Sequence, residues 1–137
     1  MSSIDLFSAF AVNTAQEQEG TPTQLPGCGD TMFKIAREGN KNYGKLLQKL
    51  VKQNRPVLDS KGDAAEAKSD EILIEVMAKT ILIGWDGEIN YKGKAYAYSV
   101  DAAKMLLAHK DFRANVMTVS SNMETFKVVK DEEDTKN

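Results

Sequence analysis

The chain has 137 residues, of which 42% are apolar and 28% are charged, and its formal net charge is −2. This length suits one compact domain that buries about two-thirds of its unfolded surface, and the composition is that of an ordinary water-soluble protein. The charge gives no overall attraction to nucleic acid or to an anionic membrane, and the single cysteine excludes an intramolecular disulfide and a multi-cysteine zinc site.

The N-terminal segment, residues 1–37, is expected to be β-rich. Residues 4–12 (IDLFSAFAV) fit a short strand or a single helical turn equally well. Residues 21–25 and 31–37 flank LPGCGD, whose Pro-Gly and Gly-Asp pairs favour a tight reversal. The alternation in 32–35 is typical of a half-buried strand, so we predict a β-hairpin. Its expected role is a lid on the helices, and the alternative is an edge that pairs with a partner strand.

A first helix is expected after Glu38-Gly39, with Asn40 or Asn42 as its N-cap. Its buried stripe is Leu46, Leu47, Leu50 and Val51, and its basic outer face is Lys41, Lys45, Lys49 and Lys52. Arg55-Pro56 should end it, because proline disfavours helix in the preceding residue, and 57–61 is expected to be a connector. A solvated surface is favoured over phosphate binding for the lysines.

The central helix is predicted to start near a cap at Asp63 and to continue to about Ile83. Its apolar stripe is Ile72, Leu73, Val76, Met77, Thr80 and Ile81. Glu75 and Lys79 should form an exposed ion pair, in the favourable order. A strand is the rival interpretation of ILIGW, because isoleucine is β-branched. The helix is preferred because the preceding periodicity is longer than a typical strand.

After a Trp-Asp-Gly turn at 85–87, residues 88–99 are expected to form a small hairpin or an extended excursion. Ser99 should cap a third helix, and Asp111 should start a fourth. The stripe of the fourth helix is Phe112, Val116, Val119, Met123 and Phe126. The pattern is lost beyond about Lys130.

These segments predict a mainly α fold with a small β component (α+β). About four helices would pack as a bundle, with an N-terminal β-hairpin and a short hairpin or excursion after the central helix. Residues 1–130 would form a single compact domain, divided into a β-rich segment (1–37) and a helical segment (40–130). Residues 131–137 would be an acidic, disordered tail.

No catalytic, cofactor-binding or metal-binding constellation is evident. His109, the only histidine, is expected to stabilise the carbonyls of a helix end rather than act as a base. Cys28 lies between glycines without neighbouring cations and is interpreted as incidental. The run 131–134 lacks the alternating ligands and glycine of a calcium loop. An enzyme is therefore the least favoured class.

Trp85 and the methionines have two interpretations each. Trp85 is expected to anchor the core, and the alternative is an exposed hot spot for a partner. Met77, Met105, Met117 and Met123 fall at or beside inward helical positions. Core filling is their expected role, and the alternative is an adaptable groove for a foreign helix.

Three stretches taken in order carry a family resemblance: EQEGTPTQL with FKIAREGNKNYGKLLQKL, then ILIEVMAKTILIGWDGEINYKGKAYAYS, then VDAAKMLLAHKDFRANVMTVSSNMETF. The series resembles the small tail assembly chaperones of long-tailed, siphovirus-like bacteriophages. The resemblance covers nearly the whole chain and rests on patterns of fold rather than of chemistry.

The resemblance implies a mainly helical protein of the host cell cytoplasm that binds the tape-measure protein. It would keep that protein soluble while the tail tube assembles, and it would be absent from the mature virion. The tail-tube protein and a second copy of the chain are further candidate partners; no membrane is expected, and nucleic acid is not favoured.

Surface reasoning gives the candidate partner-binding residues as Phe33, Trp85, Tyr91, Tyr96 and Tyr98. The alternative functions are a structural virion component, such as a connector or minor tail protein, and a small nucleic-acid binder that uses the lysine face. The observation that separates the first alternative is a ring-like copy number in purified particles.

Overall fold

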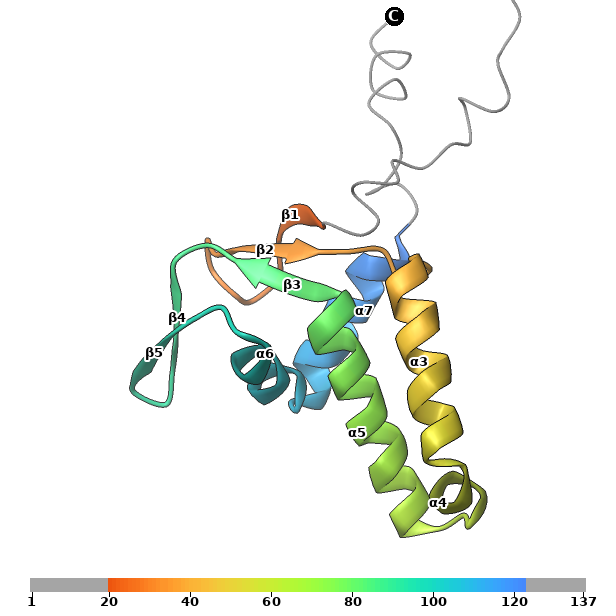
Figure 1. Ribbon diagram of the computed structural model, residues 1–137. Helices are drawn as coiled ribbons and strands as arrows, with labels where there is room; N and C mark the ends of the chain where they lie inside the picture. The colour runs from red at the N-terminus through yellow and green to blue at the C-terminus, as the bar shows by residue number, and fades with distance from the viewer. Residues whose placement is uncertain (1–19, 123–137) are drawn as a thin grey trace, which may run out of the picture.

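The computed structural model describes residues 20–122 (Figure 1). The predictions for residues 4–12, for Met123 and Phe126 and for the tail at 131–137 lie outside the described residues. The elements are β1 (Thr21–Gln24), β2 (Met32–Ile35), α3 (Lys41–Gln53), α4 (Arg55–Asp59), α5 (Asp63–Thr80), β3 (Leu82–Trp85), β4 (Glu88–Tyr91), β5 (Lys94–Ala97), α6 (Val100–Leu107) and α7 (Lys110–Ser121). The predicted α+β class is confirmed.

Helix α5 packs against α3, α4, α6 and β3. Figure 1 shows α3 and α5 as an antiparallel pair joined by α4, with α6 on the other side of α5 in this view. Ile72, Val76 and Met77 are buried, as the predicted stripe requires. The Glu75 carboxylate accepts from Lys79 Nζ at 3.0 Å, which confirms the predicted i, i+4 ion pair.

The prediction that α5 continues to about Ile83 was wrong. The helix ends at Thr80, and residues 82–85 form strand β3, which pairs with β2 in a sheet of order β1-β2-β3. The helical stripe continues into ILIGW without a break, so periodicity does not mark the boundary. Residues 82–85 form a strand because they pair with the open edge of β2, which was predicted as the second arm of the hairpin. Strand β2 lies about 50 positions upstream, so no local sequence pattern could indicate this pairing.

A β-bulge sets the faces of β3. Phe33 pairs with Trp85 and Ile35 with Leu82, and the register shifts between Lys34 and Ile35. Phe33, Ile35, Leu82 and Trp85 are all buried, although strict alternation would turn Leu82 and Trp85 to opposite faces. The extra residue in β3 therefore brings both side chains to the core.

The connector predicted at 57–61 is partly helical, so that prediction was also wrong. Helix α3 does end before the Arg55-Pro56 pair, but α4 begins there, with Pro56 in its first turn. Proline is tolerated at this position because the first helical N–H groups have no intrahelical acceptor. The cap predicted at Asp63 lies one residue earlier, at Gly62, and Asp63 opens α5.

Strands β4 and β5 form a hairpin, one of the two alternatives expected for this segment. Tyr91 pairs with Lys94 across a two-residue loop, and both loop residues have positive φ, 51° at Lys92 and 83° at Gly93. This is the geometry of a type I′ turn, which suits the twist of an antiparallel pair. The hairpin projects from the body in Figure 1. Ser99 caps α6 by accepting from the Ala102 N–H, as predicted.

The buried polar residues in 20–122 are Asn40, Thr80 and Ser120, and they surround one junction. Asn40 Oδ1 accepts from the Tyr43 N–H at 2.9 Å and caps α3, while its Nδ2 donates to the carbonyls of Arg37 and Thr80. Ser120 Oγ donates to the Ala36 carbonyl at 2.8 Å. The start of α3, the end of α5 and the end of α7 are thereby joined.

Replacing Asn40 with alanine should destabilise the fold by about 2–3 kcal/mol, because a cap is lost and a buried carbonyl is left without its donor. The measurement is urea unfolding followed by circular dichroism. Asn42→Ala, at an exposed position of the same helix, is the matched control and should change stability by less than about 0.5 kcal/mol. Equal losses in the two variants would contradict the junction's role.

Candidate partner-binding surfaces

Three of the predicted binding residues belong to one aromatic cluster. The rings of Phe33 and Trp85 lie 6.1 Å apart and those of Trp85 and Tyr98 lie 5.1 Å apart, both edge to face, and Phe112 joins at 5.8 Å from Phe33. Phe33 is 2% exposed and Trp85 is 7% exposed. The cluster therefore belongs to the core, and the expected role of Trp85 as a core anchor matches its position.

The polar ends of this cluster fix the β4–β5 hairpin. Trp85 Nε1 donates to the Tyr96 carbonyl at 3.1 Å. The Tyr98 hydroxyl lies 3.1 Å from the Ala78 carbonyl, in the last turn of α5 where a helix leaves carbonyls unpaired. It also lies 3.0 Å from the carbonyl of Leu82, the first residue of β3. Burial raises the pKa of the Tyr98 phenol, so it stays a donor at neutral pH.

Tyr91 and Tyr96 lie half-buried on the hairpin. The Tyr91 hydroxyl contacts His109 Nε2, and Lys92 Nζ lies 5.4 Å from the centroid of the Tyr91 ring. His109 was expected to serve the carbonyls of a helix end. That expectation was wrong: the side chain contacts Tyr91 instead, and His109 is the N-cap residue of α7. The binding role of both tyrosines stays a prediction.

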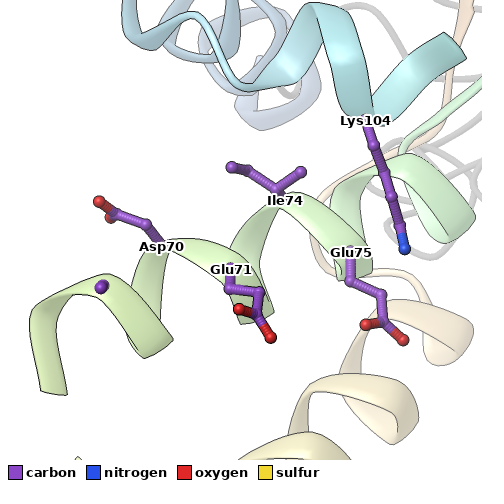
Figure 2. A pocket seen from close by; sticks show the side chains of 6 residues that line it. Asp70, Glu71, Ile74, Glu75 and Lys104 are labelled. Atoms are coloured by element: carbon purple, nitrogen blue, oxygen red, sulfur yellow. The ribbon is translucent and has the colours of Figure 1, made fainter. Parts of the chain in front are cut away.

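A hollow of about 510 Å³ lies between α5 and α6. It is lined by Ala67, Asp70, Glu71, Ile74, Glu75 and Lys104. Figure 2 shows the carboxylates projecting from α5 and Lys104 extending from α6 toward Glu75. The hydrogen bond from Lys79 is the main cause that lowers the pKa of Glu75, and the charges of Lys79, Lys104 and Lys49 add to it. Each carboxylate thus has a basic neighbour within the fold.

A smaller apolar groove of about 170 Å³ lies where α3, α4 and α5 meet. It is lined by Tyr43, Leu47, Val51, Leu58, Ser69, Ile72 and Leu73. The stripe of α3 was predicted to be buried, and this prediction was wrong. None of the residues of α3 is buried, because α5 and the short α4 cover only part of the stripe. Sequence reasoning missed this groove, since an amphipathic pattern does not say how many neighbours will cover it.

Residues 20–122 contain no group of three or more His, Cys, Asp or Glu side chains arranged to hold a metal ion. Burial raises the pKa of the Cys28 thiol, which disfavours the reactive thiolate. In the same range no helix is long and apolar enough to span a membrane.

A family model described as YdaY prophage protein matches residues 38–137. The match covers α3 to α7 and leaves out the β1–β2 hairpin. No curated protein and no solved structure matches the chain.

Tyr98→Phe should lower the free energy of unfolding by about 1–2 kcal/mol, because it removes the hydroxyl donor from the carbonyls of Ala78 in α5 and Leu82 in β3. Tyr96→Phe is the control, since the Tyr96 hydroxyl has no hydrogen-bond partner within residues 20–122. Chemical denaturation of both variants tests this. If Tyr98→Phe leaves the free energy of unfolding unchanged, the Tyr98 hydroxyl does not fix the hairpin.

Glu75→Gln should lower the free energy of unfolding by about 0.5 kcal/mol at neutral pH, because it removes the ion pair with Lys79. The pKa of Glu75 is lower in the folded state than in the unfolded chain, where it is about 4.3. The carboxylate therefore contributes its full stabilisation above the unfolded-state pKa, and this stabilisation is lost as the pH falls through the folded-state pKa. Unfolding curves of both proteins at about pH 7 and about pH 3 should therefore converge at the acid end. The cost should shrink in a Lys79→Gln background, and a cost independent of pH would contradict the assignment.

Proposed function

The chain belongs to the YdaY prophage protein family, and from this premise we propose that it is a phage tail assembly chaperone. In this role it binds the tape-measure protein in the host cell cytoplasm, keeps that protein soluble while the tail tube assembles, and is absent from the mature virion. It acts by binding and performs no reaction.

The observation that carries the proposal is the partly uncovered apolar face of α3. Leu46, Leu47, Leu50 and Val51 are all only half-buried, and the groove beside them is open. A tape-measure protein is a long helical chain whose apolar faces need cover until the tube encloses them. An amphipathic helix that enters an apolar groove is a common way to supply such cover.

The prophage family supports a phage role, and the resemblance to tail assembly chaperones in the sequence supports the narrower one. The buried positions of Phe33 and Trp85 shift the proposed contacts away from the aromatic cluster. Tyr91 and Tyr96 remain candidate contacts on the β4–β5 hairpin.

The test is co-expression with the tape-measure protein of the same phage. We expect tape-measure protein that is insoluble alone to become soluble and to co-purify with this chain. An unrelated soluble protein of similar size is the control. Failure to solubilise or co-purify would contradict the proposal. A stoichiometric copy number in purified particles, measured by mass spectrometry, would favour a structural virion component.

A further inference from the structure

Helix α3 and α4 form a basic arm on a chain that is acidic overall. Residues 41–59 hold five basic residues and one acidic residue, a net charge of +4, whereas the whole chain carries −2. Lys41, Lys45, Lys49 and Lys52 are all exposed, and the first turn of α3 has no acidic residue. An arm of this charge attracts acidic partners and repels basic ones.

The groove beside this arm is lined mainly by apolar side chains of α3 and α5. Tyr43, Leu47 and Val51 follow one another at four-residue steps along one wall, and Ile72 and Leu73 of α5 form the other. Leu58 of α4 lies among the lining residues. The volume of about 170 Å³ is below that of typical small-molecule pockets, about 300–1,000 Å³, and suits a few apolar side chains.

The lysines and the groove are close enough to act together. An α-helix with its side chains is about 10–12 Å across, so charges on the outer face of α3 lie within about one Debye length of a ligand in the groove. A helix lying along the groove would gain apolar burial from one stripe and electrostatic attraction on the flank that faces the lysines of α3.

We propose that the α3–α4–α5 groove binds an amphipathic helix of a partner protein whose apolar row is flanked by carboxylates. The apolar row covers Leu47, Val51 and Leu58, and the carboxylates face the basic arm. The inference rests on the proposed function only for the identity of the partner, which would be an acidic helical segment of the tape-measure protein.

Two synthetic peptides probe the charge requirement. Each has about 18 residues with the same leucine row, and the flanks are all glutamate in one and all lysine in the other. Fluorescence anisotropy with the full chain should give affinity at least about tenfold tighter for the glutamate peptide, and binding should weaken from about 50 to about 300 mM salt. Equal affinities, or no binding of the glutamate peptide, would overturn the proposal.

Paired variants locate the site. Leu47→Gln should weaken binding of the glutamate peptide by about tenfold or more. Val57→Gln, at an exposed position of α4 outside the groove, should leave the affinity unchanged. The double change Lys41→Glu and Lys45→Glu should weaken it more than Lys92→Glu with Lys94→Glu, which alters net charge equally on the β4–β5 hairpin. These charge variants keep the inference testable if Leu47→Gln unfolds. If the two variants of each pair change the peptide affinity equally, the assignment of the peptide to this groove is wrong.

The chain's own acidic run, residues 131–134, and a second copy are the competing occupants. Neutralising the run to Asn and Gln in the full chain should leave the affinity for the glutamate peptide unchanged, and a gain of about tenfold would assign the groove to the tail instead. A dimer that Leu47→Gln converts to monomer in sedimentation would assign it to a second copy. Either result would overturn the proposal.

The same variants separate this inference from the chaperone proposal. If the tape-measure complex forms but is unaffected by Leu47→Gln and by the Lys41 and Lys45 changes, the groove assignment fails and the chaperone role stands. If the peptide binds in the groove but no complex forms, the groove assignment stands and the chaperone role fails.

Discussion

The hydrogen bonds of the Asn40 side chain are the constraint on which the arrangement of the elements depends. One amide oxygen closes the first turn of α3, and the amide nitrogen binds the carbonyl of Thr80, the last residue of α5. The neighbouring Ala36 donates its N–H to the Ile81 carbonyl and accepts from Ser120. Because these groups are buried and have lost their contact with water, each needs a hydrogen-bond partner within the fold, and the junction supplies it. The entry to α3, the turn from α5 into β3 and the end of α7 are therefore set together.

Local chemistry was sufficient to predict much of the fold. The cap at Ser99 and the break before Pro56 follow from side chains within a few residues of the feature they determine. The cap at Asn40 and the hairpin around Lys92-Gly93 were each one of two alternatives that the local sequence left open. Strand β3 could not be predicted this way. Its residues suit a helix or a strand, and the choice depends on pairing with β2, which is distant along the chain.

The candidate site was harder to predict than the fold, for a physical reason. Large aromatic side chains suit both protein interfaces and cores, and a sequence does not say which use the fold makes of them. Here Phe33, Trp85 and Tyr98 form the contact between the sheet and the β4–β5 hairpin. The apolar surface that we propose for a partner lies on α3, whose leucines look like ordinary core residues. Only the number of neighbouring elements distinguishes the two cases.

That no side chain of α3 is buried has an evolutionary consequence. Substitutions at exposed positions change the free energy of folding little, so the outer face of α3 (Lys41, Lys45, Lys49 and Lys52) is free to vary, while its half-buried stripe, the junction and the core of α5 stay under selection for packing. Adaptation to a diverging partner and preservation of the fold then act on separate sets of positions. A lineage could change its specificity through α3 without first acquiring compensating mutations elsewhere.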